Sequence, residues 1–195
     1  MLFNYRSIPL KSFVYTNRCN NGNFANGTTG WAANGSSISS NNGVLACTGN
    51  GSDVNPRFYQ ATVTWALNKK IYIRAKTKVT NSLCNNLKYW LSCPGMTTKQ
   101  LTIASNPTQD QEYNLGAIGI LTAGGSGSVY AQIIHNYADV ATANTKVMQV
   151  QDVIIIDLTS LYGAGNEPSA TDCDNIFKFV DGTKQPNFSK SLAIL

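Results

Sequence analysis

The sequence predicts an all-β fold, an antiparallel β-sandwich or jelly roll with one short helix near the C-terminus. Eight or nine short segments have the character of strands, and turn-forming pairs such as Asn42-Gly43 and Gly124-Gly125 separate them. Only 13% of the residues are charged, so Asn, Thr, Ser and Gly supply the polarity, as in β-rich surfaces with many turns. The length of 195 residues suits one domain with short extensions.

The predicted strands follow one another at the spacing of a sandwich. The segment 70–80 alternates most regularly, with its core-facing residues at the odd positions from Ile71 to Val79. We expect the opposite face of this segment to be solvated, with a subunit interface or a site for an anionic glycan as the alternative. That face carries Tyr72, Arg74, Lys76 and Lys78. The predicted strands cover residues 44–48, 57–65, 70–80, 87–92, 100–104, 113–121, 128–135 and 146–156.

A strand followed by one helical turn is predicted from residue 153. The four β-branched residues at 153–156 fit a buried strand, which Asp157 ends by bonding to nearby backbone. Leu158, Leu161 and Tyr162 then fall on one face of a helical turn.

A short helix is predicted over residues 169–180. Ser169 and Asp172 have the spacing of a helix capping box. The apolar residues that follow recur at helical spacing and form one stripe, made of Cys173, Ile176, Phe177 and Val180. We therefore expect this helix to pack back on the sandwich, with Ile176 and Phe177 buried.

The segment 157–169 reads Asp-Leu-Thr-Ser-Leu-Tyr-Gly-Ala-Gly-Asn-Glu-Pro-Ser. This string closely resembles a signature of structural proteins from phages and prophages of Gram-positive bacteria, in which it closes a sandwich similar to carbohydrate-binding modules. The resemblance implies a virion structural protein, such as a capsid decoration, head-fibre or tail component. It implies partners among other virion proteins, and assembly in the cytoplasm of the bacterial host.

The segment from Asn20 to Trp31 resembles the opening of jelly-roll domains of the galactose-binding and carbohydrate-binding-module type. In many such modules, acidic residues in this opening and an Asp on the last strand hold a structural calcium ion. Here Asn23 and Ala25 stand where acids are common, and Asp152 is the candidate for the last-strand Asp. Because calcium prefers several hard oxygen ligands, a calcium ion is left open and no other cofactor or metal is expected.

Residues 1–18 are predicted to be an N-terminal arm or a first strand, followed by the domain at 19–182 and a tail at 183–195. By analogy with phage fibres and decorations, we expect a homo-oligomer, with a trimer as the first expectation. The arm would anchor it to a neighbouring virion protein through its apolar residues, Phe3, Tyr5, Ile8, Leu10, Phe13 and Tyr15. The alternative is that residues 13–15 begin the first strand of the domain itself.

Catalytic patterns are scarce, and we expect no enzyme. His135 is the single histidine, and no nucleophile motif accompanies it. Asp110 and Glu112 read as a turn before a strand rather than as a glycosidase pair. The five cysteines show no zinc or redox spacing and are expected to be reduced thiols, with a disulfide between Cys84 and Cys93 as the alternative.

Aromatic side chains are the candidate binding residues, because sugar rings stack on Tyr and Trp. The candidates are Trp31, Tyr59, Trp65, Tyr72, Tyr89, Trp90 and Tyr130, and of these Tyr72, Tyr89 and Trp90 are chosen for a carbohydrate site. A host cell-surface glycan is therefore the alternative partner, bound by an adhesion module. The net charge of +5 has no basic run, so nucleic acid is not expected. No signal peptide or membrane-spanning segment is expected either.

Overall fold

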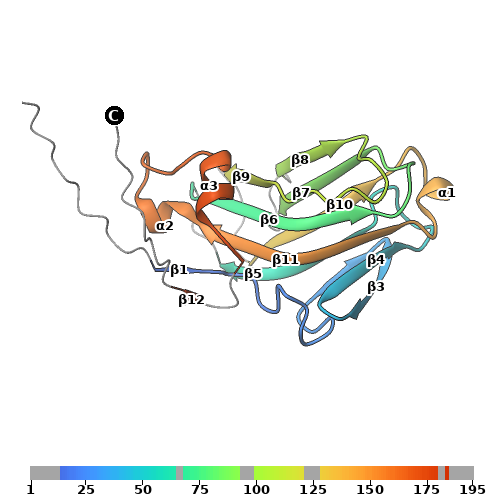
Figure 1. The fold of residues 1–195 in the computed structure, drawn as a ribbon, viewed down its shortest axis with the longest axis horizontal. Coiled ribbons are helices and arrows are strands. Elements are labelled where there is room, and N and C mark those ends of the chain that lie inside the picture. The colour runs from blue at the N-terminus through green and yellow to red at the C-terminus, as the bar shows by residue number, and fades with distance from the viewer. Residues whose placement is uncertain (1–13, 65–67, 93–98, 121–127, 180–182, 185–195) are drawn as a thin grey trace, which may run out of the picture.

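The computed structural model describes residues 14–64, 68–92, 99–120, 128–179 and 183–184, and shows a sandwich of two five-stranded antiparallel sheets (Figure 1). The all-β prediction is confirmed. The first sheet has the order β2-β5-β10-β7-β8, with strands Ala32–Asn34, Arg57–Thr64, Ser128–Asn136, Asn86–Ser92 and Lys99–Ser105. The second sheet has the order β3-β4-β11-β6-β9, with strands Ser36–Asn41, Val44–Gly49, Val147–Asp157, Lys70–Val79 and Gly116–Ile120.

The main core lies between the two sheets and contains the inward residues of both. The alternation predicted for residues 70–80 is confirmed on its inner side, where Ile71, Ile73, Ala75, Thr77 and Val79 are all buried. Residues from the first sheet meet them across the sandwich, namely Phe58, Leu87, Tyr89, Leu91, Ala131 and Ile133. Burial of this apolar surface is the main force that holds the two layers together.

Among the described residues, three strands and one helix were not predicted, and one of these strands, Thr183–Lys184, lies in the predicted tail. The strand β3 has the polar sequence Ser-Ser-Ile-Ser-Ser-Asn and forms a hairpin with β4, through a turn at Asn42 and Gly43 whose φ angles are 49° and 76°. Such a turn suits the twist of a hairpin, which explains the strand despite its weak apolar pattern. The short strand β2 pairs with β5, and the helix α1 spans Val140–Ala143.

The opening loop at residues 20–31 is held by amide side chains. Asn21 donates to the carbonyls of Gly27 and Thr29 and accepts from the amide of Asn26. Gln60 donates from Nε2 to the carbonyls of Asn20 and Gly30 and accepts from the Asn20 amide. These bonds fix the loop against the first sheet.

The acid proposed for the last strand is engaged elsewhere. Asp152 lies at a bulge in β11 with a φ angle of 52°, and its carboxylate is 2.8 Å from the ammonium of Lys76. Among the described residues, no group of three or more His, Cys, Asp or Glu side chains is placed to hold a metal ion. Asp152 is therefore paired with a lysine on the neighbouring strand β6.

The segment after β11 forms two helices, α2 at Leu158–Tyr162 and α3 at Ala170–Ile176. Asp157 caps α2 by accepting from the Ser160 amide at 2.8 Å, and its carboxylate is 2.9 Å from the Lys69 ammonium. The predicted capping box at Ser169 and Asp172 is present in α3. This helix is shorter than predicted, because the backbone is already extended at Phe177.

Glu167 ties the loop between the two helices to the sheet. Its carboxylate accepts from the Thr159 hydroxyl at 2.7 Å, from the Lys70 ammonium at 3.0 Å and from the Gly165 amide at 2.9 Å. The hydrogen bond from Thr159 is the main cause that lowers the pKa of Glu167 from its ordinary value of 4.5 to about 2. The ends of the Asp157–Ser169 segment are thus fixed by carboxylates that are ionised at neutral pH.

The helices α2 and α3 cover one end of the outer face of the second sheet and bury a second, smaller core (Figure 1). Its members are Tyr15, Tyr72, Ile154, Ile156, Leu158, Cys173 and Phe177. The burial of Phe177 is confirmed, and Ile176 is only partly buried. The prediction of a solvated face is wrong for Tyr72 and Arg74, which are 0% and 6% exposed, because α3 lies over them.

The two ends of the described chain lie together at the pole that carries α2 and α3 (Figure 1). Here β1, Tyr15–Thr16, pairs with β12, Thr183–Lys184. Cys47, Cys84 and Cys173 are buried free thiols, so the alternative disulfide from Cys84 is not formed. Within the described ranges, no helix has the length and apolar character needed to cross a membrane.

Candidate functional site: an aromatic groove on the first sheet

The outer face of the first sheet carries an open groove of about 260 Å³. Its lining comes from four neighbouring strands, β2, β5, β10 and β7, and consists of Asn34, Arg57, Tyr59, Ser92, Tyr130 and Gln132. These residues face outward because they alternate with residues such as Phe58, Ala131 and Ile133, which point into the core. The core pattern of the strands therefore decides which side chains form the groove.

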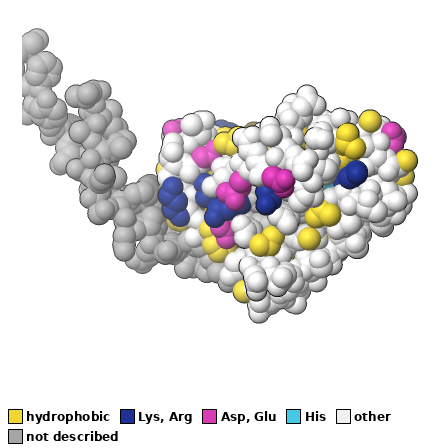
Figure 2. Space-filling model, turned by 45° about the vertical axis from the view of Figure 1, so that its right-hand side comes forward, with side chains coloured by type: hydrophobic (Ala, Val, Ile, Leu, Met, Phe, Trp, Pro, Cys, Tyr) yellow, Lys and Arg dark blue, Asp and Glu magenta, His cyan; other side chains and the backbone are white. Residues whose placement is uncertain are grey.

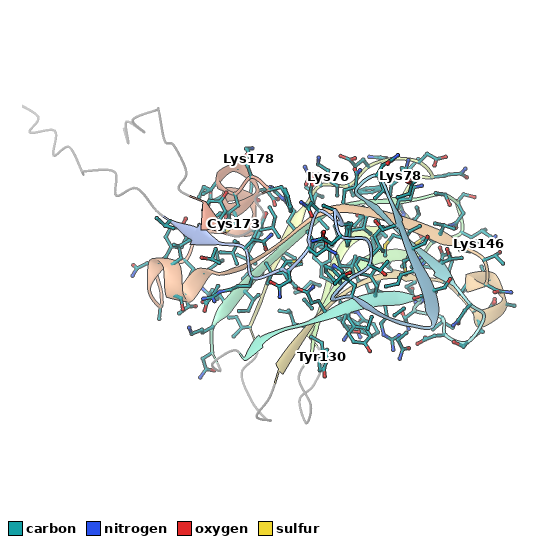
Figure 3. All side chains as sticks on the ribbon, turned by 90° about the horizontal axis from the view of Figure 1, so that it is seen from below. Lys76, Lys78, Tyr130, Lys146, Cys173 and Lys178 are labelled. Atoms are coloured by element: carbon teal, nitrogen blue, oxygen red, sulfur yellow. The ribbon has the colours of Figure 1, made fainter. Side chains whose placement is uncertain are left out.

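Two tyrosines form the apolar part of the groove. Tyr59 and Tyr130 meet edge to face, with ring centroids 5.6 Å apart and an angle of 75° between the planes. They lie diagonally across adjacent strands, since Tyr59 is opposite Gln132 and Tyr130 is two residues away from Gln132. Figure 3 shows Tyr130 on the side of the sandwich opposite Lys76 and Lys78. Both rings are only partly buried, so they offer C–H and π surface to a ligand.

The polar part of the groove is built of amides and hydroxyls. Gln132 donates from Nε2 to the Ser92 hydroxyl at 2.7 Å, which fixes the amide while its oxygen stays available as an acceptor. Asn34 is exposed at the edge strand and adds a second amide. Because an amide and a hydroxyl both donate and accept, these groups can match sugar hydroxyls in either role.

Arg57 is the cation of the groove, and its position is fixed from two sides. Its Nη1 donates to the Asp53 carboxylate at 2.6 Å and to the Asn55 carbonyl at 2.9 Å. The guanidinium carbon lies 5.6 Å from the ring centroid of Trp90. The pKa of Asp53 is lowered, because its hydrogen bonds to Asn55 and Arg57 together outweigh the larger single effect of burial, which raises it. These contacts therefore hold the Arg57 side chain over the Trp90 ring.

Two of the three residues predicted for the carbohydrate site are buried inside the domain. Tyr72 is buried beneath α3, and its hydroxyl donates to the Asp174 carboxylate at 2.5 Å. Tyr89 is 1% exposed and points into the main core, where its hydroxyl accepts from the Ala75 amide at 2.8 Å. Neither ring can stack on a sugar. Trp90 does lie on the outer face and is partly exposed, but Arg57 covers its ring.

Part of the information that identifies the two groove tyrosines is present in the sequence. Tyr59 and Tyr130 were both aromatic residues in predicted strands, and Tyr59 precedes the buried Gln60 while Tyr130 precedes the buried Ala131. Alternation within each strand was visible, but the pairing of β5 with β10 was not. That pairing brings together two residues 71 positions apart, since 130 less 59 is 71.

Of the six residues predicted for docking, the structure describes Tyr15 alone. Phe3, Tyr5, Ile8, Leu10 and Phe13 lie outside the described residues. Tyr15 is not available for docking, because it is 4% exposed and packs edge to face on Phe177 with ring centroids 4.9 Å apart. Its hydroxyl donates to the Lys178 carbonyl at 3.0 Å. Tyr15 therefore belongs to the domain.

The titratable groups considered for catalysis lie away from the groove. His135 is buried, its Nδ1 is 2.9 Å from the Tyr137 hydroxyl, and burial lowers its pKa to about 3. Burial raises the pKa of the Cys47 and Cys84 thiols to about 12 and 11, so both are protonated at neutral pH. Asp110 and Glu112 are exposed beside the second sheet. The described lining of the groove combines two tyrosine rings with amides, a hydroxyl and a guanidinium, which suits it to binding by stacking and hydrogen bonding.

Solved structures with the same architecture include a family 16 carbohydrate-binding module. It aligns with a TM-score of 0.52 at 14% identity, over 71% of this chain and 99% of that one. The tandem family 22 modules of Paenibacillus barcinonensis Xyn10C align with a TM-score of 0.54 at 14% identity, over 73% of this chain and 50% of that one. The fold is therefore that of carbohydrate-binding modules.

A phage protein also has this fold in one part. The enzymatically active domain of tailspike protein 4 from bacteriophage CBA120 aligns with a TM-score of 0.50 at 10% identity, over 71% of this chain and 21% of that one. No family model and no curated protein matches the sequence. At such low identities the likenesses establish the fold alone.

Proposed function

We propose that this protein is a non-enzymatic glycan-binding module whose binding site is the groove on the first sheet. The observation that carries the proposal is the outward pair Tyr59 and Tyr130, flanked by the amide of Gln132. Exposed aromatic rings beside amides provide stacking surface and hydrogen bonds for a polyhydroxylated ring. The carbohydrate-binding-module fold supports this reading.

Replacing Tyr130 by Ala is expected to weaken glycan binding at least tenfold, which corresponds to about 1.4 kcal/mol. The substitution removes the ring that carries the stacking surface, and Tyr130→Phe should retain most of the affinity. A glycan array with residues 14–184 would identify a ligand, and calorimetric titration of that ligand would compare the variants.

The matched control for Tyr130 is Thr102→Val. Thr102 is exposed on β8 and pairs with Lys88, so it lies on the same sheet face without lining the groove. Its replacement should leave the affinity unchanged. Equal binding by wild type and Tyr130→Ala, or release of sugar fragments from the bound glycan, would contradict the proposal.

A second proposal places this module on a phage particle, as a capsid decoration, head-fibre or tail component that works as a homo-oligomer. The resemblance of the Asp157–Ser169 string to virion structural proteins favours it. A fold shared with part of a phage tailspike is compatible with that setting. In this reading a host cell-surface glycan is the partner of the groove, and other virion proteins are the partners of the N-terminal arm.

Deleting residues 1–10 is expected to leave a folded domain that no longer joins particles. The cut stops before Tyr15, whose burial against Phe177 belongs to the domain. The melting temperature and the oligomeric mass by light scattering would be measured first, followed by incorporation into purified particles. A truncated protein that unfolds, or that still assembles normally, would show that the arm is not the anchor.

A further inference from the structure

We infer that the outer face of the second sheet carries a separate binding groove for a neutral saccharide. This hollow measures about 360 Å³, which is larger than the groove on the first sheet and within the usual range of ligand sites. The polar residues described in its lining are Lys76, Thr77, Lys78, Asp110, Glu112, Gln149 and Gln151. The inference goes beyond the proposed function, because it concerns the opposite face of the sandwich (Figure 3).

The floor of this second groove is a regular patch of side chains on β6 and β11. Gln151 lies opposite Lys76, and Gln149 lies opposite Lys78. Neighbouring strands are about 4.8 Å apart, and residues two apart on a strand are separated by about 7 Å. The four side chains thus cover an area that corresponds to one sugar ring, with Val44 of β4 at its side.

The rim of the groove is the segment that carries Asp110 and Glu112, and the backbone fixes it against β6. The Asp110 amide donates to the Val79 carbonyl at 2.9 Å, and Thr77 and Tyr113 exchange two hydrogen bonds of 2.8 Å. The Thr108 amide also donates to the Tyr113 hydroxyl at 2.9 Å. A rim held in this way is built before any ligand arrives, which lowers the entropy cost of binding.

The charges of the groove disfavour an anionic ligand. Lys76 is paired with Asp152 at 2.8 Å, which leaves Lys78 as one positive charge against two negative charges, Asp110 and Glu112. Figure 2 shows the same mixture of signs, with basic and acidic side chains adjoining one another on the face in view. Such a surface offers an anionic polymer no net attraction.

The chemistry of the groove fits hydroxyl groups in particular. The ammonium of Lys78 donates, the carboxylates accept, and the amides of Gln149 and Gln151 do both. A sugar hydroxyl also donates and accepts, so a single ring can use several of these groups at once. Because Val44 is the one apolar residue among the described lining residues, we expect the binding to be weak, with a Kd of about 1 mM.

The test is a nuclear magnetic resonance titration of the ¹⁵N-labelled protein with cellotetraose, chitotetraose and tetragalacturonate. At least one of the two neutral oligomers is expected to shift the side-chain amides of Gln149 and Gln151, while tetragalacturonate binds at least tenfold more weakly there. Gln151→Leu should weaken the shifts of this set at least tenfold. The control Thr48→Val removes a hydroxyl on the same sheet face outside the groove and should change nothing.

The two grooves are distinguished by their own variants. Tyr130→Ala should leave the shifts around Gln149 and Gln151 intact, whereas Gln151→Leu should leave those around Tyr59 and Tyr130 intact. Shifts confined to the first sheet, preferential binding of tetragalacturonate, or full binding by Gln151→Leu would each overturn the inference. Shifts confined to the second sheet would support it and contradict the function proposed for the aromatic groove.

Discussion

Replacing Phe177 by Ala is expected to destabilise the protein by about 3–5 kcal/mol. Phe177 is 1% exposed. It lies at the end of α3 and connects that helix to β6 and to β1. Its ring packs on Tyr15 with centroids 4.9 Å apart and on Tyr72 with centroids 5.7 Å apart. Truncation would leave a cavity lined by these rings, which cannot collapse without moving β1 or β6.

Urea denaturation of the two proteins would measure this loss. The neighbouring substitution Lys178→Ala is the control, because Lys178 is exposed and its backbone carbonyl still accepts from Tyr15. We expect the control to stay within about 0.5 kcal/mol of the wild type. A Phe177→Ala protein with unchanged stability would show that the packing of α3 and Phe177 on the second sheet does not stabilise the sandwich.

Replacing Arg74 by Met is expected to lower the free energy of unfolding by about 2–6 kcal/mol. Arg74 is buried under α3, and its guanidinium donates to the carbonyl of Asp174 at 2.9 Å and to that of Phe177 at 2.5 Å. These carbonyls belong to the end of the helix, where carbonyl oxygens have no partner within the helix. Met keeps a similar volume but cannot donate, and each buried acceptor left unpaired costs about 1–3 kcal/mol.

The matched control for Arg74 is Lys78→Met, on the same strand and the same face. It removes one positive charge as well, but Lys78 makes no hydrogen bond to α3 and is only partly buried. Thermal unfolding should show a large fall in melting temperature for Arg74→Met alone, and faster amide hydrogen exchange in α3. Equal behaviour of the two variants would mean that charge rather than helix docking sets the effect.

The sequence determined the fold class and most of the strands by local patterns alone. The odd positions of β6 point into the core as the alternation predicted, and the capping box at Ser169 starts α3. Both features depend on residues within a few positions of one another, so periodicity and cap chemistry are enough to find them. The polar strand β3 lacked such a pattern, and only its hairpin with β4 makes it a strand.

The two candidate binding surfaces were decided by tertiary structure. Tyr72 and Lys76 share one face of β6, yet α3 buries the first and leaves the second at the edge of an open groove. Tyr59 and Tyr130 become a pair only because β5 lies beside β10. Alternation in a single strand predicts which residues share a face. Whether that face meets solvent, a helix or another ring depends on contacts between distant segments, and these have no local signal in the chain.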